Sequence, residues 1–267
     1  MAKTFNIITN GTEFSTEIAN NVKAKLSEWG YTVTDEFSHD AELTITIGGD
    51  GLFLDSIQDH DIPEMPFVGI NTGHLGFFQE VAVDDMYKCF DDYLKGNYTI
   101  QTLPLVKVRV ESKDGITEHY GMNEITLRGP HTSLIHLDVF IGENFIERFS
   151  GDGILVATPA GSTAYNYSLG GSIVDPRIKV LQMTPIAPNN TTAYRSFISS
   201  LMLPPEQTLE VEPDLDKLND YMYVVYDGCE HMYEGVTKLS IGFSDKEVKL
   251  IRFAGYDFWD KVMTKFL

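Results

Sequence analysis

The amino-acid sequence predicts an α/β fold: an N-terminal open, mainly parallel sheet with flanking helices, and a C-terminal antiparallel β-rich domain. Over the first hundred residues, short apolar segments alternate with segments of helical apolar spacing, as in βαβ units. Later in the chain, strand-like segments separated by turn signals replace this pattern. We therefore expect an α/β domain at 1–100, a β-rich domain at 101–250, and a tail at 251–267 that packs back on the first domain.

The N-terminal elements carry local start and stop signals. Residues 5–9 and 43–47 are apolar and contain β-branched side chains, which favours strands. Between them, apolar residues recur at helical spacing, with Thr12 as the expected N-cap and Gly30 as the expected stop. The further expected elements are a helical stretch near 52–57, a strand at 67–70 and a helix at 84–95 that ends at Gly96.

The C-terminal part contains strand-like segments at 106–110, 134–141 and 236–241. Turn signals occur at 113–115, which reads Lys-Asp-Gly, and at 142–144, which reads Gly-Glu-Asn. Short strands joined by such turns are typical of an antiparallel β domain.

Composition excludes several classes of protein. The 267 residues are 43% hydrophobic and 22% charged, which argues against disorder. The net charge of −19 repels nucleic acid and anionic membranes, so we expect neither as a partner. A substrate that carries phosphate must therefore be bound by backbone N–H groups, helix N-termini, local cationic side chains or a divalent cation.

The expected compartment is the cytoplasm. The sequence has no apolar segment of transmembrane length and no secretory pattern at its start. Cys89 and Cys229 lie far apart in the chain and form no Cys-x-x-Cys pair, so two reduced thiols are expected. The histidines match no zinc-binding pattern, and the sequence does not indicate which residues would bind a metal.

A glycine loop, Gly48-Gly49-Asp50-Gly51, follows the buried strand at 43–47 and precedes a helical stretch. Glycines let a phosphate approach the backbone, and the helix N-terminus offers partial positive charge. Asp50 could accept a proton from an attacking hydroxyl or hold Mg²⁺. The alternative is a tight turn in which Asp50 caps the helix. The loop is neither a Walker A sequence nor a Gly-x-Gly-x-x-Gly fingerprint.

The stretch 151–171 is rich in small and polar residues and contains the sequence Thr-Pro-Ala-Gly-Ser-Thr-Ala-Tyr-Asn-Tyr-Ser at 158–168. Its small residues give access to the backbone. Thr163, Tyr165, Asn166 and Ser168 offer donors and acceptors suited to a purine edge and ribose hydroxyls. The alternative is a surface helix capped by Ser162 or Thr163.

Two shorter segments are further candidates. Asn123 and Glu124 precede a strand-like segment and could meet one ligand only at a strand end or bulge; otherwise they form a solvated strand edge. At 69–78, glycines suit a loop at the sheet edge where Asn71 could bind a diphosphate, the alternative being a plain turn. His74 in that loop is expected to be structural.

Taken in this order, the four segments resemble the NAD kinase family over nearly the whole chain, to about residue 250. The Gly-Gly-Asp-Gly loop alone is shared with diacylglycerol and sphingosine kinases. The run 151–171 is much more specific to NAD kinases. The stretch 189–197 departs from the commoner Arg-Pro pattern and is similar to the Gram-positive branch of the family.

The resemblance implies transfer of the γ-phosphate of ATP, or of a polyphosphate phosphate in some bacterial members, to the 2′-hydroxyl of the adenosine ribose of NAD, giving NADP. It further implies Mg²⁺ or another divalent cation, and a homodimer or homotetramer. Asp50 matches the family's proton acceptor, and Asp152 matches a residue near the nicotinamide, in some members across a subunit contact. The expected nucleotide-binding residues are Gly49, Gly51, Asn71, Asn123, Glu124, Asp152, Ala160, Thr163, Ala164, Tyr165, Asn166, Ser168 and Ala187.

The chain departs from the family pattern at some positions. Leu52 stands where relatives commonly have Thr, and Ser150 stands where many have Arg; Cys229 falls in a variable segment. Two alternatives therefore stay open: a non-catalytic NAD(P)-binding sensor, and a lipid kinase that shares the glycine loop. An intact loop with Asp50 favours the enzyme over the sensor. The charge of −19 and the polar cluster at 163–168 argue against the lipid kinase.

Overall fold

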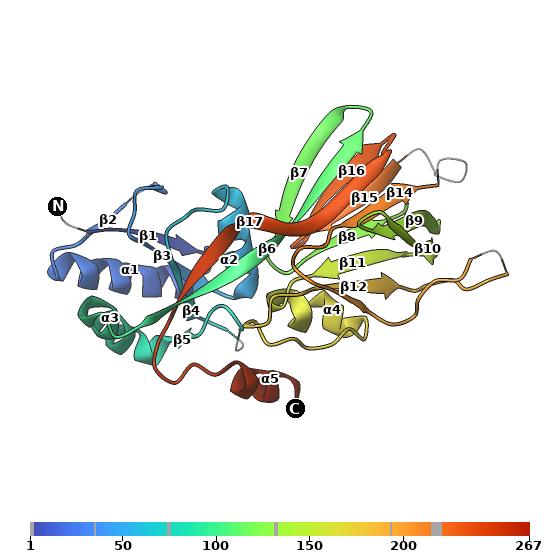
Figure 1. Ribbon diagram of the computed structural model, residues 1–267. Helices are drawn as coiled ribbons and strands as arrows, with labels where there is room; N and C mark the ends of the chain where they lie inside the picture. Colours follow the sequence, from blue (N-terminus) through green and yellow to red (C-terminus); the bar gives the residue numbers. More distant parts are fainter. Residues whose placement is uncertain (1–2, 35, 74–75, 131–132, 193, 215–220) are drawn as a thin grey trace. The chain divides into compact units, whose positions relative to one another are not determined.

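The structure is a computed structural model of the 267-residue chain and describes all residues except 1–2, 35, 74–75, 131–132, 193 and 215–220 (Figure 1). The chain forms two compact units. One comprises Met1–Leu103 and Glu247–Leu267, and the other comprises Pro104–Lys246. The first holds a mainly parallel sheet with helices and the second holds antiparallel sheets, so the predicted fold class is confirmed.

The sheet of the first unit has the strand order β2-β1-β3-β4, and its neighbouring strands are parallel. Its strands are β1 (Thr4–Thr9), β2 (Thr32–Val33), β3 (Leu43–Gly48), β4 (Phe67–Asn71) and β5 (Val81–Ala82), which pairs with β4. All six residues of β3 are buried, as expected for a parallel strand covered on both faces. The end of β17 (Lys238–Arg252) adds to β4 in parallel at Leu250.

The helices of this unit are α1 (Glu13–Glu28), α2 (Asp50–Asp59), η1 (Val83–Asp85), α3 (Met86–Lys95) and α5 (Phe258–Phe266). α1 begins as predicted, because Oγ1 of Thr12 accepts the N–H of Ser15 at 3.3 Å. α3 ends as predicted at Gly96, whose φ of 76° is readily adopted only by glycine. α2 begins at Asp50, earlier than the predicted stretch near 52–57.

The second unit is built from antiparallel strands. One sheet has the order β13-β12-β11-β8-β15-β16, and another contains β10-β9-β14-β17, with β6 and β7 as a paired hairpin. The strands are β6 (Thr99–Ser112), β7 (Gly115–Gly121), β8 (Glu124–Arg128), β9 (Ile135–Ile141), β10 (Asn144–Gly151), β11 (Gly153–Ala157), β12 (Leu181–Ile186), β13 (Leu201–Leu203), β14 (Leu209–Pro213), β15 (Tyr221–Tyr226) and β16 (Cys229–Glu234). The predicted turns at 113–115 and 142–144 join β6 to β7 and β9 to β10.

The core of the second unit draws side chains from both sheets. Leu127 and Val156 of the first sheet are buried in one cluster with Leu137 and Val211 of the other. After β11 the chain forms the short helices η2 (Ala160–Thr163) and α4 (Tyr165–Ser168). The segment 158–168, which is predicted to bind a ligand, therefore directly follows the buried strand β11.

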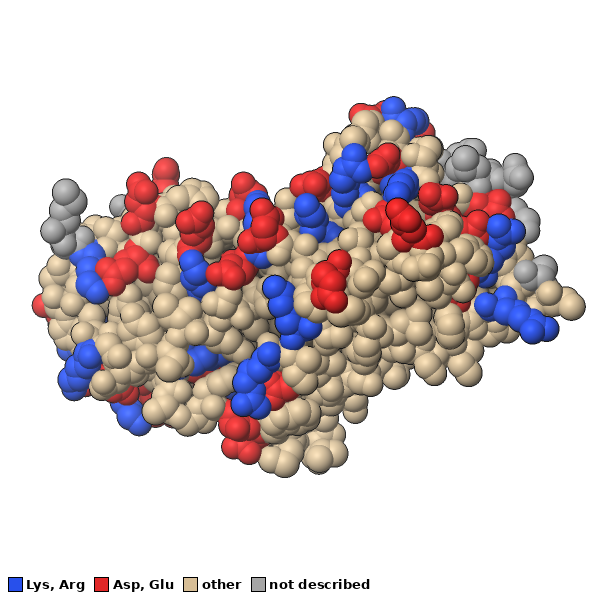
Figure 2. Space-filling view, in the orientation of Figure 1, with Lys and Arg blue, Asp and Glu red and all other residues tan. Residues whose placement is uncertain are grey.

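Acidic and basic side chains are interspersed on the face of the molecule that Figure 2 draws. On the face drawn in Figure 2, Asp and Glu side chains lie among the Lys and Arg side chains over both units. A phosphate group must therefore find its positive partners locally. Among the described residues, no helix is both long and apolar enough to cross a membrane.

Candidate functional site

The glycine loop lies at the carboxyl edge of the parallel sheet in the first unit. β3 ends at Gly48, which pairs with Asn71 at the end of β4. Open α/β sheets bind their ligands outside this edge. α2 starts at Asp50, with Gly49 as its N-cap and no side-chain cap from the described residues. Because the first N–H groups of a helix lack partners within the helix, this end can bind an anion.

The glycines at 49 and 51 are not required by the packing of the protein itself. A Cβ atom on either one would meet no described atom within 4 Å, and neither has a positive φ. Gly48 differs, since a Cβ there would lie 2.7 Å from Cδ2 of Leu52. Open space at 49 and 51 next to a helix N-terminus suits a phosphate group.

The carboxylate of Asp50 is held by the main chain of 77–79. Its Oδ2 accepts the N–H of Phe77 at 2.8 Å, and its Oδ1 accepts the N–H groups of Phe78 and Gln79 at 3.1 Å each. An ionised carboxylate has about four lone-pair sites, so these bonds leave about one for a further donor. The expectation that Asp50 merely caps its helix does not describe this arrangement. Nζ of Lys265 lies 3.9 Å from Oδ2 of Asp50.

A close approach makes glycine necessary at position 76. A Cβ there would lie 2.1 Å from Oδ1 of Asp50. Gln79 completes the contact, because its Nε2 donates to the carbonyl of Gly49 at 3.1 Å. The glycine loop and the segment 76–79 thus form one unit of structure, which we call the Asp50 cradle.

The turn after β4 directly precedes the segment 76–79 of the cradle in the sequence. Oδ1 of Asn71 accepts the N–H of Gly73 at 2.8 Å, and the hydroxyl of Thr72 bonds that of Ser15 at 3.0 Å. The side chain of Asn71 therefore shapes its own turn, and its expected contact with a diphosphate stays a prediction. His74 lies outside the described residues.

In the second unit, Asn123 directly precedes β8 and Glu124 is its first residue. The pair therefore lies at the end of a strand, as the predicted ligand site requires. The carboxylate of Asp227 accepts the N–H groups of Met122 at 2.6 Å and Asn123 at 2.7 Å. Asp227 stands between β15 and β16 with a φ of 47°, a left-handed conformation that Asp tolerates. The Asp-Gly pair at 227–228 is a turn signal, but no neighbouring residue in the sequence indicates its contact with Met122 and Asn123.

Glu124 carries an oxygen that is suited to a ligand. Burial raises the pKa of its carboxyl to about 8, and the nearby charge of Asp227 adds to the effect. Its Oε2 and the Oδ1 of Asn123 are both buried without a hydrogen-bond partner in the described part of the chain. Buried polar atoms are rarely left unpaired, so these acceptors indicate a site for hydroxyl or N–H donors of a ligand.

The segment after β11 is tied to the same place. The hydroxyl of Thr158 donates to the carbonyl of Met122 at 2.6 Å and accepts the N–H of Gly161 at 3.1 Å. A Cβ on Gly161 would lie 2.0 Å from the carbonyl oxygen of Asn123, so only glycine fits. The structure therefore brings Ala160 and its neighbours against Asn123.

The predicted binding residues of 160–168 differ in exposure. Ala160 and Thr163 are nearly buried, Ala164 is half-buried, and Tyr165 and Ser168 are exposed. Asn166 is fully buried: its Nδ2 donates to the carbonyls of Ser162 (3.2 Å) and Ser172 (3.3 Å), and its Oδ1 accepts the hydroxyl of Thr184 at 2.7 Å. Asn166 is therefore occupied in holding α4 against β12.

Asp152 and Ala187 lie at the other end of β11. Ala187 follows Ile186, which pairs with Gly153. Ala157, at the end of β11, pairs with Glu124 and lies five residue steps from Asp152, which at about 3.3 Å per step is roughly 17 Å. Asp152 is exposed and lines a pocket of about 290 Å³ with Arg128 and other residues. The second unit does not bring Asp152 together with Glu124.

Among the residues that the structure describes, no group of three or more His, Cys, Asp or Glu side chains could hold a metal ion. The first unit has a glycine loop at the edge of its parallel sheet, and the second has buried oxygens on Asn123 and Glu124 without partners among the described residues. Each feature is typical of an enzyme of mixed α/β fold that binds a nucleotide and transfers phosphate.

Comparison with known proteins identifies the family. Residues 3–98 match the model of the ATP-NAD kinase N-terminal domain, and residues 122–253 match that of the ATP-NAD kinase C-terminal domain. The NAD kinase of Finegoldia magna is 36% identical over 271 residues, covering 100% of this chain and 98% of the relative. That of Staphylococcus carnosus is 29% identical, covering 98% and 97%. The chain belongs to the NAD kinase family, and the predicted family is confirmed.

Solved structures show the same fold. The structure of a yeast NADH kinase in complex with NADH superposes with a TM-score of 0.85 at 22% identity, covering 98% of this chain and 86% of that one. The structure of an Archaeoglobus fulgidus NAD kinase in complex with ATP has a TM-score of 0.79 at 21% identity, covering 98% and 99%.

Proposed function

We propose that this protein transfers the γ-phosphate of ATP to the 2′-hydroxyl of the adenosine ribose of NAD, giving NADP. The observation that carries the proposal is the open space over the N-terminus of α2 at Gly49 and Gly51, beside the Asp50 carboxylate, in a member of the NAD kinase family. A phosphate bound there is neutralised by N–H groups despite the acidic surface.

Asp50 is the proton acceptor in this proposal. The 2′-oxygen forms a bond to the γ-phosphorus, the bond from the γ-phosphorus to the bridging oxygen breaks, ADP leaves, and the hydroxyl proton passes to Asp50. Its carboxylate has about one lone-pair site left beyond its N–H donors. Such a transfer depends mainly on positioning and charge neutralisation, so few catalytic side chains are needed.

The second unit binds the ribose and adenine of NAD. The unpaired oxygens of Asn123 and Glu124 accept hydroxyl groups of the ribose. Ala160, Thr163, Ala164, Tyr165 and Ser168 line the adenosine part, and the exposed side chains of Tyr165 and Ser168 support this. Asn166 acts indirectly, by holding α4 through its buried hydrogen bonds.

Asp152 serves the nicotinamide end. Ala187, expected to line the adenosine part of the site, lies at the same end of β11 as Asp152. The exposed side chain of Asp152, at the far end of β11 from Glu124, supports a nicotinamide site completed by a second copy of the chain. We accordingly expect a homodimer or homotetramer, measurable by light scattering after size-exclusion chromatography. An active monomer would contradict the shared site.

The proposed reaction would use a divalent cation, expected to be Mg²⁺. Mg²⁺ is usually held by one or two carboxylates together with substrate phosphates rather than by a protein cage. The residues leave space for this pattern, because a Cβ built at Gly49 or Gly51 meets no described atom within 4 Å, so that phosphates carrying a cation can approach the loop. When bound, the cation would neutralise phosphate charge, while Gly49, Gly51 and the first turn of α2 orient the phosphates and Asn71 lies beside them.

The proposed compartment is the cytoplasm. No disulfide joins Cys89 or Cys229 to another cysteine in the described part of the chain, as suits a reducing environment.

The decisive experiment incubates the purified protein with NAD, ATP and Mg²⁺ and measures NADP. The Asp50→Asn variant is expected to lose most of the rate, about 100-fold or more, and still bind NAD. Parallel reactions with polyphosphate and with NADH define the donor and the acceptor. NAD binding without NADP formation from any donor would replace the kinase by a sensor, and near-normal turnover of Asp50→Asn would remove Asp50 as the base.

A further inference from the structure

We propose that the C-terminal segment of the chain positions Asp50: Lys261 and Arg252 hold the carbonyl groups of Gly76 and Phe77, which aims the Asp50 cradle. This inference rests on the proposed function of Asp50. It assigns Lys261 as a positioning residue that acts through the main chain of 76–79 and does not touch the substrate.

The planarity of the peptide group links the carbonyls of Gly76 and Phe77 to the N–H groups that bond Asp50. In a trans peptide, the carbonyl of one residue and the N–H of the next point in opposite directions in one plane. The N–H groups of Phe77 and Phe78 that bond Asp50 therefore share their planes with the carbonyls of Gly76 and Phe77. A donor that holds either carbonyl also fixes the direction of the N–H on the other side.

Cationic donors hold both carbonyls. Nζ of Lys261 donates to the carbonyl of Gly76 at 2.9 Å, and Nη2 of Arg252 donates to that of Phe77 at 3.2 Å. Hydrogen bonds from charged donors are roughly twice as strong as neutral ones. The peptide groups 76–77 and 77–78 are thus held on one side by cations and on the other by the Asp50 carboxylate.

Arg252 is itself rigidly placed. It is only 5% exposed, forms an ion pair with Glu80, and donates from Nε to Oε1 of Gln101 at 2.7 Å. Its guanidinium lies 3.8 Å from the ring centre of Tyr256. Since removal of one partner of a buried ion pair is costly, a variant at Arg252 would disturb the fold as well as the cradle. Lys261 is the better position to test.

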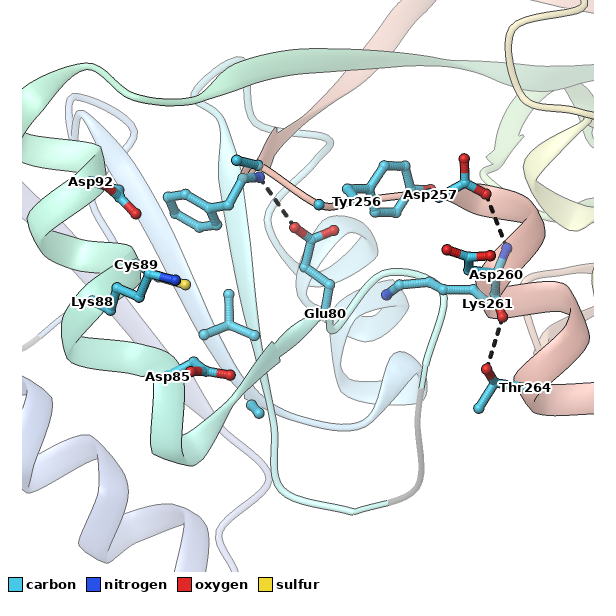
Figure 3. A pocket seen from close by; sticks show the side chains of 15 residues that line it. Glu80, Asp85, Lys88, Cys89, Asp92, Tyr256, Asp257, Asp260, Lys261 and Thr264 are labelled. Carbon is cyan, nitrogen blue, oxygen red and sulfur yellow. Dashed lines mark hydrogen bonds between the residues drawn. The ribbon is translucent and has the colours of Figure 1, made fainter.

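Lys261 reaches the cradle from α5. Figure 3 shows its side chain extending from that helix toward the side of the pocket where Glu80 lies. Phe258 and Val262 bury one face of α5, and Nζ of Lys261 lies 5.5 Å from the ring centre of Tyr256. Phe258, Phe266 and Lys265 of α5 also contact the side chain of Phe77. Lys261 is the residue of α5 that bonds the carbonyl of Gly76.

The hydrogen bond from Lys261 to Gly76 can be tested through the ionisation of Lys261. Burial lowers the pKa of its ammonium to about 8; Glu80 and Asp50 oppose the shift, and Arg252 and Lys265 add to it. The other charged groups around the pocket of about 430 Å³ are Asp85 at the end of η1, Lys88 and Asp92 of α3, and Asp257 and Asp260 at the start of α5. Above pH 8 the Lys261 bond to Gly76 loses its charge and weakens.

The test compares Lys261→Met and Lys261→Arg with the matched control Lys249→Met. Lys249 also donates to a main-chain carbonyl, that of Glu64 at 3.4 Å, in an exposed hydrogen bond. We expect Lys261→Met to lower kcat about 10- to 100-fold, the scale expected for a misplaced catalytic group, with KM for NAD within about two-fold. The Lys249→Met control is expected to behave as the unmodified protein.

The pH profile separates positioning from simple stability. The kcat of the unmodified protein is expected to fall above pH 8, where Lys261 loses its proton. Lys261→Arg is expected to keep most of kcat and to lose this alkaline fall, because arginine stays charged. Faster hydrogen exchange at the amides of Phe77 and Phe78 in Lys261→Met is the expected readout without turnover.

Each result decides the matter. A kcat of Lys261→Met equal to that of Lys249→Met, or an unchanged alkaline fall in Lys261→Arg, overturns the positioning role. If Lys261→Met does not fold, the pH profile of Lys261→Arg alone decides. An unmodified protein that makes no NADP refutes the proposed function itself, whereas an active one with an unaffected Lys261→Met refutes only this inference.

Discussion

Replacement of Glu124 by glutamine is expected to stabilise the protein increasingly as the pH rises from 5 to 8. The carboxyl of Glu124 has a pKa raised to about 8 from its ordinary 4.5, mainly by burial. Between these values the folded state binds one proton more than the unfolded state, so the free energy of unfolding falls with rising pH. Glutamine has the same shape as glutamate and no charge, so the free energy of unfolding of Glu124→Gln does not fall with pH in this way.

The size of the effect follows from the shift. At 1.36 kcal/mol per pKa unit, the shift of Glu124 from 4.5 to about 8 corresponds to roughly 5 kcal/mol, accumulated over that range. Glu124→Gln should therefore be about as stable as the unmodified protein near pH 4.5 and more stable by up to about 5 kcal/mol near pH 8. This is a large part of the 5–15 kcal/mol that stabilises a typical folded domain.

Urea denaturation at pH 5, 6, 7 and 8 measures the difference. The control is Glu143→Gln, which alters an exposed glutamate in the turn between β9 and β10. It should show no such pH-dependent gain. A difference between Glu124→Gln and the unmodified protein that stays constant from pH 5 to 8 would refute the assignment of a buried, protonated carboxyl at this position.

Two glycine variants test the two halves of the proposed site. Gly51→Ala adds a methyl group into open space, so we expect unchanged thermal stability but a KM for ATP raised about 10-fold, by loss of the close approach of phosphate to the backbone. An unchanged KM would show that no ligand uses this space. Gly161→Ala would place a Cβ 2.0 Å from the carbonyl oxygen of Asn123, so we expect a loss of about 2 kcal/mol or more and much weaker NAD binding. Calorimetry and titration with NAD check both effects, and a stable variant with normal affinity would contradict the observed packing.

Much of the fold could be predicted because its signals are local. The cap at Thr12 and the stop at Gly96 depend on residues within one helical turn, and both are observed. The turns at 113–115 and 142–144 likewise join neighbouring strands. The start of α2 at Asp50 was missed because the glycines at 49 and 51 carry no helical signal of their own.

The candidate site was only partly predictable. The chemistry of Asp50 follows from its place after a strand, but its N–H donors come from 77–79, which packs against it through Gly76. Asn166 offers the hydrogen-bonding groups of a ligand-binding residue, yet its partners Ser162, Ser172 and Thr184 bury it completely. Residue type specifies what a side chain can bond, whereas packing decides which partner reaches it first.

The sequence by itself determined the fold class and the family, because strand and helix periods and the motif at 151–171 are written in neighbouring residues. Only the tertiary structure decided how these residues are used. It set Asp152 at the far end of β11 from Glu124, and it brought Lys261 to Gly76 across 185 positions of sequence. Contacts of this kind depend on how distant elements pack, and no local pattern in the chain records them.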